Sequence, residues 1–275
     1  MSTNILKISP RNPKLGWASN YNRYWFGGCP LKSNWMNALS TTFPHAERFF
    51  IETVKHYQAQ ITDPVLAEQV KGFIGQEAAH RMEHDRFNQL LKSEGYPVEK
   101  MEARVAKLFD WVRKNPDPEV KLALTCALEH FTTILCTEVL KTPTFHEPMQ
   151  KEYKRLWCWH CLEEIEHKTV AYDVYQSING SYRTRLVEVI HASAGLWLIL
   201  ISTMMAYQRH DGRLFNLRDW WVLITWGFIW PGLLTRLIPN YFRYYKKSYH
   251  PSHMHDQGLI DKWREKLGFN VEVQD

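Results

Sequence analysis

The chain has 275 residues, of which 45% are hydrophobic and 14% aromatic, so it can bury a large core and is not an intrinsically disordered protein. The 13 glycines and 13 prolines are too few for a turn-rich all-β fold. Basic residues exceed acidic ones by 34 to 29, a net charge of +5, which is too small for a nucleic-acid partner. The five cysteines form no evenly spaced framework and no signal pattern opens the sequence, so we expect a reducing, cytoplasm-facing environment.

The first half of the chain changes character near residue 40. Residues 1–39 are rich in Asn, Pro, Gly and Trp without a helical period, and we expect them to form an N-terminal arm. Hydroxyl residues beginning at Ser40 can cap a helix, and the apolar spacing that follows predicts that this helix continues to Thr62. A second helix is expected to begin at Pro64 and to continue to residue 93.

Three further helices are expected before residue 180. They are a short one at 102–112 and two long ones at about 119–141 and 149–178. The connections between the four long helices are therefore short, long and short, which is the topology of a ferritin-like four-helix bundle in an all-α protein. The expected organisation is an arm, a bundle over residues 40–180, and a hydrophobic helical pair with a tail over residues 181–275.

Two of these helices carry a similar pattern of carboxylates and imidazoles. At about 100° per residue, Glu77, His80 and His84 of the second helix fall on one face. In the fourth helix the residues that share one face are His160, Glu164 and His167. Each helix therefore presents a Glu-x-x-His pair together with one further histidine.

Each Glu-x-x-His helix is preceded by a helix that can offer one inward glutamate, Glu47 before the first and Glu129 before the second. One Glu from each of two helices and Glu-x-x-His from each of the other two is the ligand pattern of dinuclear carboxylate sites in helical bundles. Mixed carboxylate and imidazole ligands favour iron, with manganese as the alternative, over a structural zinc site. We therefore expect two metal ions.

The predicted ligands, which are also the predicted catalytic residues, are Glu47, Glu77, His80, Glu129, His160, Glu164 and His167. His84 and Glu163 are expected to contact these ligands without binding the metal themselves, and so to orient them. Small residues beside Glu129, among them Thr132 and Cys136, are expected to leave room for a substrate.

Three sequence motifs carry a family resemblance. The segments FPHAERFF, GQEAAHRMEH and WHCLEEIEHK resemble the predicted metal-dependent hydrolases of bacteria, in this order and over roughly residues 20–240. The resemblance implies a metal-dependent enzyme. The ligand pattern is also similar to that of the di-iron p-aminobenzoate N-oxygenases, in which a third histidine joins the cluster. The C-terminal third does not look like an N-oxygenase, so an arylamine substrate is not implied.

The C-terminal third contains two stretches free of Asp, Glu, Lys and Arg. The first has 20 residues, between Glu188 and Arg209, and reaches the length of a spanning helix, whereas the second has 16, between Asp219 and Arg236, and falls short. Two interpretations stay open. The pair forms a membrane hairpin with its basic flanks and the bundle on the cytoplasmic side, or the helices are buried against the bundle or in a homodimer interface.

These observations favour a non-haem di-iron oxidoreductase of the oxygenase type, which acts on a lipophilic small molecule and takes electrons from a donor. The first alternative is a dinuclear hydrolase that uses a hydroxide nucleophile. The second is a non-enzymatic metal-binding protein. We expect the protein at the cytoplasmic face of the membrane, or in the cytoplasm if the hydrophobic helices are buried in the protein.

Overall fold

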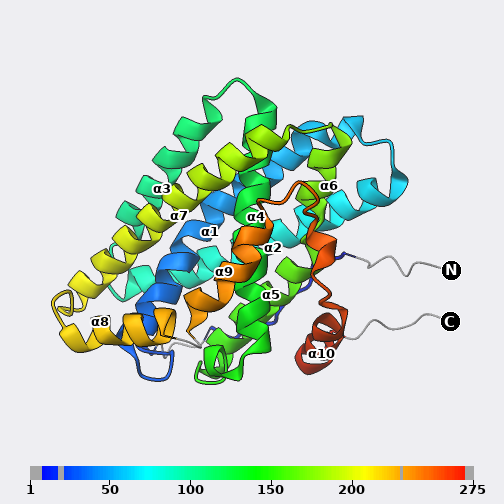
Figure 1. Ribbon diagram of the computed structural model, residues 1–275. Coiled ribbons are helices and arrows are strands. Elements are labelled where there is room, and N and C mark those ends of the chain that lie inside the picture. The colour runs from blue at the N-terminus through cyan, green and yellow to red at the C-terminus, as the bar shows by residue number, and fades with distance from the viewer. Residues whose placement is uncertain (1–7, 18–21, 230–231, 270–275) are drawn as a thin grey trace.

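The computed structural model describes residues 8–17, 22–229 and 232–269, and within these ranges the chain is all-helical, as expected (Figure 1). The one β-type contact in this part of the chain is an isolated bridge between Phe26 and Met149. The all-α prediction is confirmed.

Four long helices form the bundle. They are α1 (Pro30–Tyr57), α2 (Pro64–Ser93), α4 (Pro118–Lys141) and α5 (Lys151–His167). Helix α1 packs against α2, and α4 packs against α5, so the two hairpins lie side by side. The long connection between the hairpins contains α3 (Val98–Arg113), which is longer at its start than the expected 102–112.

Helices α2 and α4 begin in the same way. The side chain of Asp63 accepts a hydrogen bond from the amide of Val65 (2.9 Å), and that of Asp117 accepts one from the amide of Glu119 (2.8 Å). A proline follows each aspartate, at the first helical position, where its missing N–H costs nothing. Local sequence therefore fixes where α2 and α4 begin.

The first helix begins at Pro30 rather than near Ser40, so residues 30–39 belong to α1. Between residues 31 and 44 every side chain except Lys32 is buried. A helix that is covered on all sides lacks the alternation of apolar and polar residues from which a helix is recognised in a sequence. This is the physical reason that the expected beginning of the helix was wrong.

The expected continuous helix over 149–178 is interrupted. Helix α5 ends at His167, and α6 (Val170–Ser177) begins after two residues. At the interruption the Lys168 ammonium donates to Asp256 Oδ2 (2.8 Å) and to the carbonyl of Met254. The residues at the break include no glycine or proline, so the contact that accompanies it is long-range and has no local sequence signal.

The C-terminal third covers one side of the bundle. Helix α7 (Tyr182–His210) packs along α1 and α4, and in Figure 1 it slants across the bundle next to α3. Helix α8 (Leu217–Leu223), a short π-helical segment (Ile224–Phe228) and α9 (Leu233–Arg243) follow it. The last helix, α10 (Gln257–Leu267), packs on α5.

Two helices in the described part of the chain are long and apolar enough to cross a membrane, α4 and α7. The most apolar window of α4 is 78% buried inside the protein, whereas that of α7 is only 28% buried. Helix α4 is therefore an interior helix of the bundle. The segments 217–228 and 233–243 pass the same test only as a pair bent by 41°, across a break that includes residues outside the described ranges.

Candidate metal centre

The seven predicted ligands meet in the middle of the bundle. Glu47 lies on α1, Glu77 and His80 on α2, and Glu129 on α4, while α5 contributes the other three. None of the seven side chains is more than 3% exposed. Four helices thus bring four carboxylates and three imidazoles into one interior site.

One carboxylate lies at the centre of the cluster. Glu164 Oε1 is 3.4 Å from His80 Nδ1, 3.5 Å from His160 Nε2 and 3.7 Å from His167 Nε2. On the other side of the cluster, His167 Nε2 is 3.2 Å from Glu77 Oε1 and 3.4 Å from Glu129 Oε2. The carboxylates of Glu77 and Glu164 therefore face several imidazoles at once.

The donor atoms fall into overlapping groups, in each of which all atoms lie within 4.8 Å of one another. The groups that use only predicted ligands are Glu47, Glu77 and His80; His80, His160 and Glu164; and Glu77, Glu164 and His167. Because Glu77, His80 and Glu164 each belong to two groups, the cluster offers adjacent positions that share ligands. Such sharing is how carboxylates bridge paired metal ions.

Most of the inward-facing polar atoms have no hydrogen-bond partner. Both carboxylate oxygens of Glu47, Glu77 and Glu129 are buried and make no hydrogen bond, and neither do the Nε2 atoms of His160 and His167, although several of these atoms lie 3.2–3.5 Å from an oppositely charged partner. An unpaired buried polar group costs about 1–3 kcal/mol, and more when it is charged. Since these atoms converge on one another and are the donor types that bind iron or manganese, the residues fit a dinuclear metal site.

The pKa shifts divide the ligands into two classes. Burial raises the pKa of the carboxyls of Glu47, Glu77 and Glu129. Burial opposes protonation of His80 and His167, but the neighbouring carboxylates, which accept from the protonated imidazoles and attract their charge, outweigh it and raise their pKa values. In the metal-free protein these shifts favour protonation of the carboxyls and of the two imidazoles.

The other ligands behave differently. Burial alone would raise the pKa of Glu164, but the imidazoles of His167, His80 and His160 outweigh it and lower that pKa. Burial lowers the pKa of His160 and of His84, with a smaller contribution from neighbouring imidazoles. These shifts favour the charged form of Glu164 and the neutral forms of the two histidines.

A glutamine that the sequence did not single out orients His167. This residue is Gln76. Gln76 Oε1 accepts a hydrogen bond from His167 Nδ1 (3.0 Å), and Gln76 Nε2 donates one to Glu166 Oε2 (3.2 Å). Glu166 in turn accepts from Arg264 Nε (2.6 Å). The hydrogen bond to Gln76 places the ring proton on Nδ1 and leaves Nε2 free to bind a metal.

Glu163 lies beside His80 and makes an ion-pair contact with it rather than a hydrogen bond. His80 Nε2 is 3.2 Å from Glu163 Oε2, so Nδ1 is the atom that faces Glu77 and Glu164. Glu163 also accepts hydrogen bonds from the amide and the guanidinium of Arg11 (3.1 and 3.2 Å).

The N-terminal arm therefore reaches the candidate metal centre through the side chain of Arg11. The Arg11 guanidinium also donates to both carboxylate oxygens of Glu166 (2.6 and 2.9 Å). The arm lies tightly on α2, where a Cβ on Gly72 would collide with the carbonyl of Ile8. No motif in the sequence pointed to Arg11, because its partners are about 150 residues away.

His84 uses both ring nitrogens in hydrogen bonds. Its Nε2 lies 3.2 Å from His160 Nδ1, and its Nδ1 lies 2.9 Å from Ser40 Oγ. A further group of donors combines it with Glu47 and His160, but binding a metal through Nε2 would break the hydrogen bond that orients His160. The geometry agrees with the supporting role expected for His84.

The hydrogen-bond chain continues into the bundle through Ser40. The Ser40 hydroxyl donates to Asn88 Oδ1 (2.9 Å), and Asn88 Nδ2 donates to the carbonyl of Ser40 (3.3 Å). That carbonyl is available because Pro44, four residues later in α1, has no N–H to donate. The interior proline thus leaves the Ser40 carbonyl free to accept the hydrogen bond from Asn88 on this side of the site.

The comparison with protein families decides the family of this chain. The family model described as predicted metal-dependent hydrolase matches residues 9–255. The chain belongs to this family. The match to the predicted metal-dependent hydrolase family extends beyond the 20–240 of the motif-based resemblance and includes Arg11 and all seven metal-facing residues. No curated protein and no solved structure matches the chain.

Replacing Gln76 tests the orientation of His167. We expect Gln76→Leu to weaken binding of Mn²⁺ about 10- to 100-fold, because His167 loses the hydrogen bond that fixes its ring. The measurement is a titration of metal-free protein, with Gln89→Leu, an exposed position of the same helix, as the control. Equal affinities for the two variants would contradict the role of Gln76.

Proton release tests the charge state of the cluster. Raised pKa values favour protons on carboxyls and imidazoles of the cluster, and a metal must displace those protons, so affinity is expected to rise as the pH increases from about 5 to 8. Calorimetry in buffers of different ionisation enthalpy should show net proton release. Binding without proton release over this range would show that the carboxylates and imidazoles assigned here do not bind the metal.

Proposed function

We propose that this protein is a dinuclear metal enzyme whose ligands are the seven metal-facing residues of the bundle. The observation that supports the proposal most strongly is the convergence, from four helices, of buried carboxylate and imidazole atoms that lack hydrogen-bond partners. Glu77 and Glu164 are the proposed bridging ligands. His84, Glu163 and Gln76 hold the imidazoles in orientation.

Iron is the proposed metal, with manganese as the alternative, because the cluster contains oxygen and nitrogen donors and no cysteine. When bound, two such ions supply either a hydroxide nucleophile for hydrolysis or electrons for oxygen activation. The chain itself supplies fixed ligands, charge balance and an interior that excludes bulk water.

Hydrolysis is the reaction that the family description favours. Oxygen activation, which the sequence placed first, is the second candidate, and the nature of the adjacent cavity supports it. A cavity with almost only apolar walls fits an unactivated hydrocarbon group, which an oxygen-activating site could oxidise and which a hydrolase would hold as part of an ester. The oxidative reaction would need an external electron donor.

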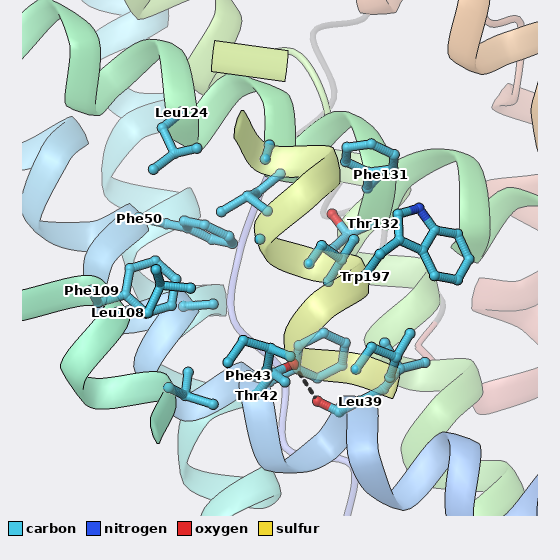
Figure 2. A pocket seen from close by; sticks show the side chains of 18 of the residues that line it. Leu39, Thr42, Phe43, Phe50, Leu108, Phe109, Leu124, Phe131, Thr132 and Trp197 are labelled. Carbon is cyan, nitrogen blue, oxygen red and sulfur yellow. Dashed lines mark hydrogen bonds between the residues drawn. The ribbon is translucent and has the colours of Figure 1, made fainter. Parts of the chain in front are cut away.

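The cavity has a volume of about 690 Å³ and lies between α1, α3, α4 and α7 (Figure 2). The aromatic ring of Phe43 lines it and also stacks on the ring of His160, with centroids 4.7 Å apart. Thr132 and Cys136 of α4 line it as well, which agrees with the space expected beside Glu129. One layer of side chains thus separates the cavity from the metal centre.

The solvent end of the cavity lies between the C-terminal end of α3 and the first half of α7. The exposed lining residues there include Trp111, which is 69% exposed, together with Lys114 and His191. Glu188, which also lines the cavity, lies 3.1 Å from His191 Nδ1, so the mouth carries polar groups of both kinds. Apolar walls with polar groups at the mouth fit a lipophilic small molecule that has a polar end. We propose such an amphiphile as the substrate class.

Metal analysis and two assays separate the candidate functions. We expect two metal ions per chain, with binding abolished in Glu164→Ala and unchanged in Glu68→Ala, an exposed position. Metal-dependent cleavage of p-nitrophenyl esters of long-chain acids would support hydrolysis, whereas an oxygen-dependent optical change of the reduced di-iron protein would support oxidation. One zinc ion per chain, or none, would contradict the dinuclear proposal, and a large mineral load would indicate storage.

Filling the cavity tests its role. Ala46 lines the cavity one residue before Glu47, so Ala46→Phe should displace a lipophilic ligand. We expect affinity for a fluorescent fatty acid to fall at least about tenfold while metal content is unchanged. The control is Ala103→Phe, at an exposed position of α3. Unchanged affinity in Ala46→Phe would show that the probe binds elsewhere.

A further inference from the structure

Exposed apolar side chains are concentrated in one part of the molecule. Among the described residues, 13 of the 16 exposed large apolar side chains lie between Val187 and Phe242. Soluble proteins rarely collect such side chains without a partner. The C-terminal third therefore presents a surface that lacks its natural contact.

On α7 these side chains form a continuous stripe. Successive members are three or four residues apart, so they share one face of the helix. The exposed fraction of the large ones lies between 41% and 70%. We name as the α7 stripe the residues Val187, Ile190, Ala194, Leu198, Ile201 and Met205.

The opposite face of α7 is attached to the bundle. Its buried side chains pack on α1 and α4. The Tyr207 hydroxyl lies 2.7 Å from Thr41 Oγ1, and Gln208 Oε1 accepts from Asn34 Nδ2 (2.8 Å). Helix α7 is thus half covered by protein along its length.

A spanning orientation of α7 would draw its neighbours into the hydrocarbon. Helix α3 packs beside it and exposes Lys100, Arg104, Lys107 and Asp110. Charged groups in the bilayer centre cost several kcal/mol each. A helix that lies flat on the membrane exposes only the α7 stripe to lipid and leaves these charges in water.

Basic residues outnumber acidic ones in the part of the chain that carries the stripe. Residues 182–250 contain nine Lys and Arg but only three acidic residues. All three acidic groups have partners within the protein: Glu188 lies 3.1 Å from His191, Asp211 accepts from Asn34, and Asp219 accepts from Arg213. The basic residues that are exposed are Arg183, Arg209, Arg218, Arg243, Lys246 and Lys247. This balance is complementary to an anionic surface.

We propose that the α7 stripe and the segment after it, Phe215–Ile229, dock on the surface of an anionic lipid leaflet without crossing it. Trp221 and Phe228 of that segment are 60% and 54% exposed. A helix with an apolar face and basic borders lies in the interface between headgroups and acyl chains. Anionic lipids are characteristic of the cytoplasmic leaflet, which is where the protein is therefore placed.

The cavity opens next to the same stripe. His191 and Ala194 belong both to the mouth region of the cavity and to the outer side of α7, between Ile190 and Leu198. A docked protein would take an amphiphile from the bilayer directly into the cavity. This entry route rests on the proposed function, whereas docking itself does not.

Vesicle flotation tests the docking. The full chain is expected to float with vesicles of phosphatidylcholine and phosphatidylglycerol and to float less with phosphatidylcholine alone. The variant Ile190→Gln/Leu198→Gln/Met205→Gln changes stripe residues that do not line the cavity, and we expect its partition coefficient to fall at least about tenfold. The matched control is Val65→Gln/Met82→Gln, with exposed apolar side chains on α2.

The charge component is tested separately. Each of Arg218→Gln and Arg243→Gln should weaken binding to anionic vesicles about fivefold at low salt, whereas Lys71→Gln and Arg81→Gln on α2 should not. Equal flotation of the stripe variant and wild type would overturn the proposal. So would a dimer in light scattering that the stripe variant makes monomeric, without any flotation, because the partner would then be a second copy.

Metal content of the same samples keeps the two proposals apart. The stripe variant should retain the metal content of the wild type, since no changed residue touches the metal centre. Flotation without any metal binding would contradict the proposed enzyme and leave the docking proposal intact. Metal binding without flotation would contradict the docking proposal and leave the proposed enzyme intact.

Discussion

The structure depends on the burial of four carboxylates and three imidazoles in the centre of a helical bundle. Charged and polar groups at this depth are unfavourable unless they are paired or bind a metal. Each helix of the bundle buries one such carboxylate at the same point, where Glu47, Glu77, Glu129 and Glu164 face one another. The metal ions proposed for this site would bind these atoms and would join the two hairpins at one point.

The surroundings of the cluster are built to keep its geometry. Gln76, Glu163 and His84 each contact the ring nitrogen of one imidazole that faces away from the cluster. Further side-chain contacts hold these three residues in place. These further contacts include Arg11 of the N-terminal arm and Arg264 of the C-terminal helix α10. Segments from both ends of the chain therefore close over the same side of the bundle, and the match to the family model includes most of this length.

Helix α7 has a separate task on each of its faces. Its inner face packs on α1 and α4 and completes the wall of the apolar cavity, while its outer face carries the exposed stripe. This double use explains why its sequence is apolar on nearly all sides although only part of it is buried. A helix that joins a cavity to an apolar surface suits a protein whose ligand is itself lipophilic.

The sequence by itself determined the helical class, the beginnings of α2 and α4, and the seven residues that meet in the middle of the bundle. These features depend on local caps and on the period of about 3.6 residues, which places Glu77 beside His80 and Glu164 beside His167 wherever the helix lies. The early beginning of α1, the break after His167 and the roles of Gln76 and Arg11 were decided only by the tertiary structure. They depend on contacts between segments far apart in the chain, and a helix buried on all sides, such as residues 31–44, has no periodic pattern to read.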